Sequence, residues 1–208
     1  MRIDKDAFVF FIPVMIVSAV LCFFYIPVAI VGLVLAGYIL FFFREPHRVP
    51  PTGEKVILSA ADGKVVGIDQ VIENDFFEEK VTRISIFLSI FDVHINYSPI
   101  AGKVLKTQHT KGKFHAANAN KSALLNENNI IGVCNEAGGR IMVKQIAGLI
   151  ARRIVCRCAP GDKMFAGQQI GLIRFGSRVE VYVPLSTKIS VKVGDRVKGR
   201  LTVLGELK

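Results

Sequence analysis

Three short stretches of this 208-residue chain carry residue types that can activate a hydroxyl group. They are SAADGKVVG with Asp62, SIFDVHINYSPIAGKV with His94, and RFGSRVEVYVP, in which Gly176 precedes Ser177. Serine, histidine and aspartate are the residue types of a nucleophilic hydroxyl with its supporting base. Each also has a purely structural interpretation: Asp62 as part of a turn, His94 as a core histidine, and Ser177 as a turn residue that begins a strand.

The elements that must position these residues begin with a long apolar run. Residues 7–43 include no charged side chain, and 51% of the whole chain is hydrophobic. One helix of that length would extend about 55 Å, whereas the hydrocarbon core of a bilayer is about 30 Å thick. Pro27 divides the run into halves of about 18 residues, each barely long enough to cross. We therefore expect a retained transmembrane helical hairpin, and basic residues at both of its ends predict that both face the cytoplasm.

The net charge of +10 resides after this run, because the first 43 residues carry two basic and two acidic side chains. A basic domain next to a membrane is expected to attract anionic lipid head groups. Nucleic acid is the rival partner for such charge, but the basic residues are scattered and no aromatic stacking motif is present, so no nucleic-acid partner is expected. The four cysteines have the spacing of neither a zinc site nor a disulfide framework, so no metal is expected.

After a proline-rich linker the pattern changes to short β-branched runs separated by glycine, which predicts a mainly β domain. The predicted strands include KVVGIDQV, VTRISIFLSIF, GRIMVKQIAG, RRIVCRCA, EVYVPL and KISVKV; AANANKSALLNEN alone has helical or loop character. Residues 159–173 and 192–207 form a weak repeat, in which Gly-Asp precedes an apolar residue, a second glycine and a strand. Such units resemble those of biotinyl/lipoyl-like barrels (barrel-sandwich hybrids), although no lysine-bearing hairpin for a carried cofactor is present.

Taken together, the motifs resemble the phosphatidylserine decarboxylase family. The sequence FFREPHR is similar to that family's signature after a membrane segment, ADGKV to its aspartate turn, and FDVHINYSPIAGKV to its histidine strand. KSALLNEN, at 121–128, is similar to its Asn-Glu-Arg stretch, and FGS to its processing site. The order of these motifs, and their coverage of residues 41–184, make the resemblance specific.

The resemblance implies that the chain cleaves itself between Gly176 and Ser177. The Ser177 hydroxyl would attack the Gly176 carbonyl, with His94 as the base and Asp62 as the residue that orients it. Elimination and hydrolysis would then convert Ser177 into a pyruvoyl group and leave chains 1–176 and 177–208. The pyruvoyl ketone would form a Schiff base with the amine of phosphatidylserine, or of its ether-lipid analogue, and accept the electrons that carbon dioxide leaves behind. His94 would return a proton to the α-carbon.

The implied organisation is a membrane hairpin over 1–43 and a pyruvoyl-dependent β domain over 44–208, located at the cell membrane with the catalytic domain on the cytoplasmic face. The expected partners are an anionic aminophospholipid, the membrane and the two cleavage products with each other, and a homo-oligomer is left open. Two departures from the family concern Arg178, where longer members carry threonine, and Phe91, where they often carry a second histidine. Two alternatives remain: a membrane-anchored, lipoyl-like binding barrel without catalysis, and a pyruvoyl enzyme for a soluble amino acid.

Overall fold

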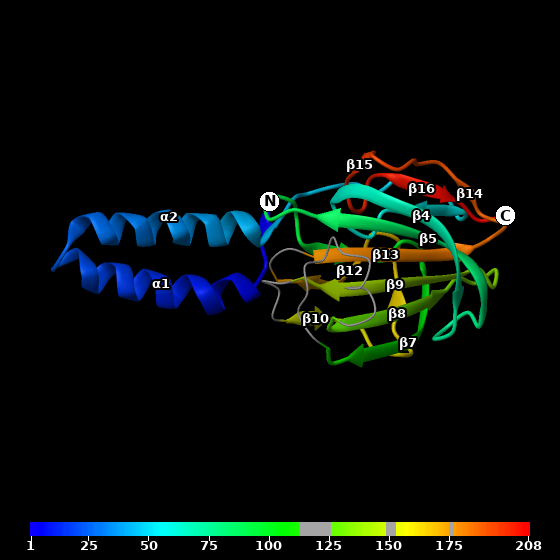
Figure 1. The fold of residues 1–208 in the computed structure, drawn as a ribbon, viewed down its shortest axis with the longest axis horizontal. Coiled ribbons are helices and arrows are strands. Elements are labelled where there is room, and N and C mark those ends of the chain that lie inside the picture. The colour runs from blue at the N-terminus through cyan, green and yellow to red at the C-terminus, as the bar shows by residue number, and fades with distance from the viewer. Residues whose placement is uncertain (113–125, 149–152, 175–176) are drawn as a thin grey trace. The chain divides into compact units, whose positions relative to one another are not determined.

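The computed structural model describes residues 1–112, 126–148, 153–174 and 177–208. The chain divides into two compact units, Met1–His47 and Arg48–Lys208. The first contains both helices, and the second is built from strands (Figure 1). Each unit is described below by itself.

The first unit consists of α1 (Asp6–Cys22) and α2 (Ile26–Phe42), with β1 (Arg2–Ile3) paired to β2 (Arg44–Glu45) at their base. The break between the helices comes at the expected place, since Pro27 lies in the first turn of α2, where its missing N–H costs nothing. Small residues let the helices approach closely: a Cβ on Gly32 would lie 2.0 Å from the Ser18 hydroxyl. The outward faces carry exposed phenylalanine, valine, isoleucine and leucine side chains.

Each helix has 17 residues, where the sequence predicted two membrane-crossing halves of about 18. Within the described residues, no helix combines the length and the apolarity needed to cross a membrane.

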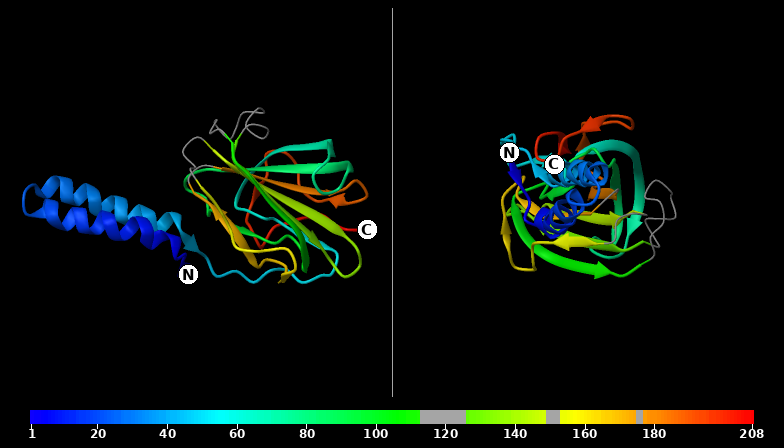
Figure 2. Two further views of the ribbon diagram at one scale, coloured as in Figure 1. Left: turned by 90° about the horizontal axis from the view of Figure 1, so that it is seen from below. Right: turned by 90° about the vertical axis from the view of Figure 1, so that its left-hand side faces the viewer.

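The second unit contains three antiparallel sheets. Its strands are β3 (Val56–Leu58), β4 (Gly63–Glu73), β5 (Glu79–Leu88), β6 (Ile95–Tyr97), β7 (Gly102–Thr110), β8 (Asn128–Cys134), β9 (Arg140–Ala147), β10 (Ile154–Cys156), β11 (Lys163–Met164), β12 (Gln169–Ile173), β13 (Ser177–Pro184), β14 (Lys188–Ile189), β15 (Arg196–Val197) and β16 (Val203–Glu206). The largest sheet has the order β11-β7-β8-β9-β13-β5-β4-β15 and is strongly curved (Figure 2). The smaller sheets have the orders β10-β12-β6 and β14-β16-β3. The domain is therefore mainly β, as predicted.

The main core lies on the concave side of the large sheet. Alternate residues of β13, Val179, Val181 and Val183, are fully buried there with Ile84 and Ile86 of β5. A smaller core on the opposite face is formed by Phe77, Val81, Ile130, Met142 and Tyr182. Strand β13 is therefore buried on both faces.

The weak sequence repeat corresponds to two turns with the same hydrogen bonds. Gly161 and Gly194 have φ values of +102° and +101°, which favour glycine. Asp162 and Asp195 accept hydrogen bonds from backbone N–H groups three residues earlier, at 2.8 and 3.0 Å. In each turn the glycine N–H also donates 2.8 Å to a core valine carbonyl, of Val104 or Val65. Both halves of the repeat therefore form the same turn, with a glycine at positive φ followed by an aspartate that accepts a backbone hydrogen bond.

Candidate active site

Ser177 is the first residue of β13, in the middle of the large sheet. It pairs with Leu88 of β5 on one side and with Ala147 of β9 on the other. Strand alternation directs its side chain to the same concave face as Val179, and the residue is fully buried. Within the described residues its Oγ has no hydrogen-bond partner. Gly176, the other predicted residue of the cleavage site, lies outside the described residues.

His94 lies in the segment that joins β5 to β6. The residue is 2% exposed, and its backbone carbonyl accepts a hydrogen bond from Ile173 at 3.3 Å. Its Nδ1 lies 2.9 Å from the carbonyl oxygen of Asp92. Because a carbonyl can only accept, Nδ1 must carry the hydrogen, and Nε2 of the neutral ring is then the atom able to take a proton. The ring is therefore held in the tautomer that a general base requires.

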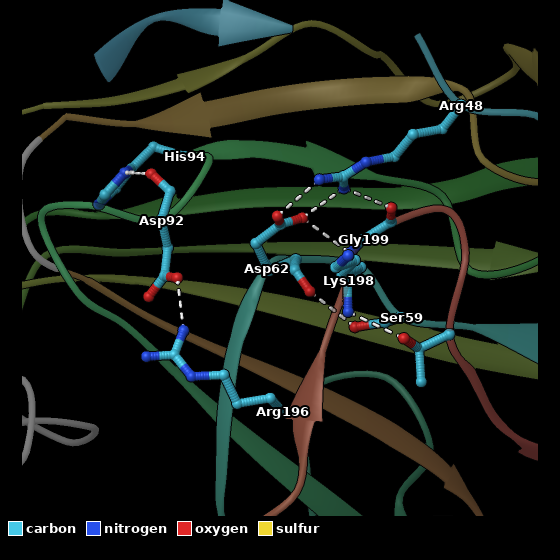
Figure 3. Close-up of polar contacts among 10 residues, drawn as sticks. Arg48, Ser59, Asp62, Asp92, His94, Arg196, Lys198 and Gly199 are labelled. Atoms are coloured by element: carbon cyan, nitrogen blue, oxygen red, sulfur yellow. Dashed lines mark hydrogen bonds and ion pairs between the residues drawn. The ribbon is translucent and has the colours of Figure 1, made fainter. Parts of the chain in front are cut away.

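The carboxylate of Asp92 fixes the backbone that holds this ring. One oxygen accepts hydrogen bonds from the backbone N–H and the hydroxyl of Ser89, at 2.8 and 2.7 Å. The other lies 3.0 Å from Nη1 of Arg196 (Figure 3). The sequence analysis assigned no role to Asp92. The Ser-x-x-Asp spacing of SIFD, which allows a side chain to close a local turn, is the signal that could have found it.

Asp62 lies immediately before β4 and is almost completely buried. Its two oxygens accept hydrogen bonds from Nη1 and Nη2 of Arg48 in the end-on geometry, at 2.5 and 2.7 Å, and one also accepts the Gly199 N–H at 2.8 Å. Arg48 in turn donates 2.8 Å to the Gly199 carbonyl. The hydrogen bond to Asp62 is the main cause that raises the pKa of Arg48 above its ordinary value. Sequence analysis quoted Arg48 only as part of a motif and missed this pairing.

The structure does not join Asp62 to His94 by a hydrogen bond in the way a triad would predict. The hydrogen bonds of Asp62 within the described residues go to Arg48 and Gly199, and its carboxylate points toward them rather than toward the imidazole (Figure 3). The Asp92 carbonyl, instead, holds the His94 tautomer.

Backbone hydrogen bonds nevertheless join the segment before Asp62 to the segment after His94. The N–H of Leu58 donates to the Pro99 carbonyl, and the N–H of Tyr97 donates to the Ala60 carbonyl, both at 2.9 Å. These bonds run antiparallel between residues 58–60 and residues 97–99, and the chain bends over residues 60–62 before β4 begins at Gly63. Gly63 permits the turn, because a Cβ there would lie 2.2 Å from the Phe87 carbonyl oxygen.

Two other features named in the sequence analysis lie next to Ser177 but not on the concave face of β13. Arg178 is directed to the convex face of the sheet, where it is 2.7 Å from Glu180, so the departure from the family at this position does not alter the concave face. The stretch KSALLNEN is described only from Asn126, whose amide donates 2.7 Å to the carbonyl of Ala147, the neighbour of Ser177. Among the described residues, no group of three histidine, cysteine or acidic side chains could hold a metal ion.

Comparisons with known proteins show one family. The family model described as "Phosphatidylserine decarboxylase" matches residues 35–205. The chain is 45% identical over 175 residues to the phosphatidylserine decarboxylase proenzyme of Desulfotalea psychrophila, covering 84% of this chain and 82% of that protein. It is 46% identical over 168 residues to the proenzyme of Syntrophus aciditrophicus, with coverages of 81% and 79%. The match to the proenzyme of Symbiobacterium thermophilum is 42% over 198 residues, with coverages of 95% and 92%.

Proposed function

This chain belongs to the phosphatidylserine decarboxylase family, and we propose that it is a pyruvoyl-dependent carboxy-lyase that converts phosphatidylserine, or its ether-lipid analogue, to the ethanolamine phospholipid and carbon dioxide. The observation that carries the proposal is the buried Ser177 hydroxyl, which has no hydrogen-bond partner within the described residues, in a chain similar to named proenzymes over most of its length. A hydroxyl with a structural role would be hydrogen-bonded at such a site. The same observation disfavours a non-catalytic barrel.

The first reaction is self-cleavage between Gly176 and Ser177. The Ser177 Oγ adds to the carbonyl carbon of the preceding peptide, its proton passes to Nε2 of His94, and the C–N bond breaks to give an ester. Elimination across the serine Cα–Cβ bond releases the carboxylate of residue 176. Water then adds and ammonia leaves, so the new chain begins with a pyruvoyl group at position 177.

The environment of Ser177 fits a pyruvoyl group, because Ser177 is fully buried and the other side chains on the concave face of β13 are valines. The pyruvoyl group supplies an electrophilic carbonyl that binds an amine and accepts electrons as carbon dioxide departs. His94, with Nδ1 hydrogen-bonded to Asp92, is the residue that returns a proton to the α-carbon. Asp62 acts as a positioning residue, because it holds Arg48 and Gly199 beside the turn that leads into β4.

The two products of cleavage remain one domain. Residues 177–208 contribute β13, β14, β15 and β16, and β13 alone pairs with both β5 and β9 along its length. Separating the products would expose the main core on both sides of β13. The two turn-strand units around Asp162 and Asp195 also support the finer classification of the domain as a barrel-sandwich hybrid.

The helical unit is proposed to anchor the enzyme to the membrane from its cytoplasmic face. Its helices expose large apolar side chains on consecutive turns, and the turn between them exposes Phe23 at 89% and Phe24 at 80%. Soluble surfaces rarely carry such an extensive apolar patch. Arg2, Lys5 and Arg44 at the base would lie near anionic head groups. Phosphatidylserine is thereby presented to the domain without leaving the bilayer.

A decarboxylation assay tests the proposal. Purified protein is incubated with vesicles containing phosphatidylserine, and ethanolamine phospholipid is measured by mass spectrometry, with Ser177→Ala as the matched control. Product formed by the wild type alone supports the proposal. Equal yields from both proteins, or none from a wild type that has cleaved itself, would contradict it. Free serine serves as the second substrate, and faster turnover of serine than of the lipid would favour the soluble amino-acid enzyme.

A further inference from the structure

Three buried amide side chains on the concave side of the large sheet are joined in a chain by hydrogen bonds that all run in one direction, from donor to acceptor. Nδ2 of Asn129 donates 2.9 Å to Oε1 of Gln145, and Nε2 of Gln145 donates 2.7 Å to Oδ1 of Asn96. All three residues are at most 1% exposed. Because each amide donates through nitrogen and accepts through oxygen, this chain leaves Nδ2 as the remaining donor of Asn96.

Nδ2 of Asn96 has no hydrogen-bond partner in the part of the chain that the structure describes. The residue is fully buried, so water does not replace the missing acceptor at an open surface. Buried donors are nearly always paired, so an exception calls for an acceptor that the described residues do not supply, and a catalytic role is one way to supply it. The hydrogen bond from Gln145 orients the Asn96 amide in advance for such an acceptor, and the hydrogen bond from Asn129 in turn orients Gln145.

The position of this donor connects it with Ser177 and His94. Gln145 pairs with Val179, two residues after Ser177, and strand alternation directs Gln145, Val179 and Ser177 to the same face. Since Gln145 bonds Asn96 directly, the Asn96 amide lies over that face. Asn96 also follows His94 by two residues, and since Val93, Ile95 and Tyr97 pack together in one cluster, His94 and Asn96 emerge on the other side of this segment. Donor, base and hydroxyl therefore face the same interior.

We propose that Nδ2 of Asn96 is the hydrogen-bond donor that stabilises the oxyanion formed when Ser177 attacks the preceding carbonyl. In that step the Oγ–C bond forms, the carbonyl π electrons move onto oxygen, and the Oγ proton passes to His94. When the oxyanion collapses, the C–N bond breaks and the proton goes to the departing amine. Asn96 donates only a hydrogen bond, and as a neutral amide it does not compete with His94 for the proton. The inference rests on the proposed self-cleavage.

The test measures the rate at which freshly synthesised chains cleave. Asn96→Asp is the main variant, because it keeps an oxygen to accept from Gln145 but has no NH2 donor. We expect cleavage about 10²–10³-fold slower, the effect of removing one oxyanion donor. Asn96→Ala, which adds no charge, should be slowed to a similar extent. Asn129→Ala removes the far end of the amide chain but leaves the donor, so it should slow cleavage less than about tenfold.

Two further measurements separate this role from a purely structural one. Each substitution is repeated in the uncleavable Ser177→Ala background, where Tm reports folding alone. Hydroxylamine, which cleaves esters, is added to the slow variants. We expect little fragment release, because the ester should not accumulate when the attack itself is slowed. Rapid release by hydroxylamine would place Asn96 at the later elimination and overturn the proposal.

The remaining outcomes are also decisive. Wild-type cleavage of Asn96→Ala, or equal slowing by Asn96→Ala and Asn129→Ala with equal losses of Tm, would overturn the role of Asn96 and leave the proposed function intact. If the wild-type chain itself never cleaves, the proposed function fails.

Discussion

The two faces of β13 carry buried polar groups that differ in one respect. On the convex face, Glu180 accepts hydrogen bonds from Tyr182 at 2.5 Å and from Ser85 at 3.5 Å, and lies 2.7 Å from Arg178. On the concave face, neither Ser177 Oγ nor the Asn96 amide nitrogen has a partner within the described residues. One strand therefore presents a bonded carboxylate on one side and an unbonded hydroxyl on the other.

This difference predicts that the convex face of β13 stabilises the fold and that the concave face carries the cleavage reaction. A buried carboxylate is stable only while its hydrogen-bond donors and ion-pair partner stay in place. The group formed by Glu180, Tyr182, Ser85 and Arg178 is therefore expected to contribute to the stability of the fold. An unbonded buried hydroxyl lowers the stability of the fold and stays available for reaction. Substitutions on the convex face should therefore change Tm, whereas those on the concave face should change the cleavage rate.

The largest effect is expected from His94→Ala. Loss of the base that takes the Ser177 proton should slow self-cleavage by about 10²–10⁴-fold, as measured by the appearance of fragments on denaturing gels. His109→Ala is the matched control, because the His109 side chain is 44% exposed and pairs with Glu127 at 3.5 Å. If both histidine variants cleave at the wild-type rate, the concave face is not the reactive one.

Glu180→Ala tests the convex face. Removing this carboxylate leaves Arg178 buried without its ion pair, and the loss of stability should be about 3–5 kcal/mol. Denaturant unfolding in the Ser177→Ala background measures it. Chains of Glu180→Ala that do fold should cleave at the normal rate, and a cleavage defect without a loss of stability would remove the distinction between the two faces.

Asp92→Ala is expected to have an intermediate effect on cleavage. Without the carboxylate that binds Ser89 and Arg196, the carbonyl that holds the His94 ring is less well fixed, and cleavage should slow by about tenfold. Arg196→Ala should have a smaller effect, because that side chain is 73% exposed. A larger effect for Arg196→Ala than for Asp92→Ala would refute the proposed role of the Asp92 carboxylate.

The smallest effect is expected from Tyr182→Phe, which removes one hydrogen bond to Glu180 and should cost about 1–2 kcal/mol at neutral pH. Burial, and next the charge of Glu180, raise the pKa of Tyr182 in the folded protein. The unfolded chain therefore loses this proton first, and stability should fall as the pH rises above about 10. The variant has no such proton, so its Tm should fall less steeply. Parallel Tm curves for the two proteins would contradict the assignment.

Local features of the fold could be predicted from sequence. The Gly-Asp turns at 161–162 and 194–195, the break at Pro27 and the strand character of residues 64–71 each depend on neighbouring residues, and all are present. Strand β8 was not among the predicted strands: its NNIIGVC sequence is apolar at the centre, but two asparagines, a residue type depleted in strands, begin it. Their amides are instead hydrogen-bonded inside the domain.

The candidate site was predictable in its residue types and less so in its contacts. Alternation places Ser177 with Val179 on one face, which sequence can show. The pairing of Asp62 with Arg48 and Gly199 joins positions up to 137 residues apart and follows only from the folded chain. Asn96 could have been noticed, since it follows His94 by two residues in an otherwise apolar strand, but its link to Gln145 depends on two sheets meeting.

The most direct test of the central claim is the intact mass of the purified protein under denaturing conditions, compared with Ser177→Ala. The account predicts two wild-type fragments that separate between residues 176 and 177, with the smaller lighter by one ammonia than a chain that begins with serine, and a single full-length mass for the variant. A single uncleaved mass for both proteins, after incubation with lipid, would contradict it and return Ser177 and His94 to structural roles.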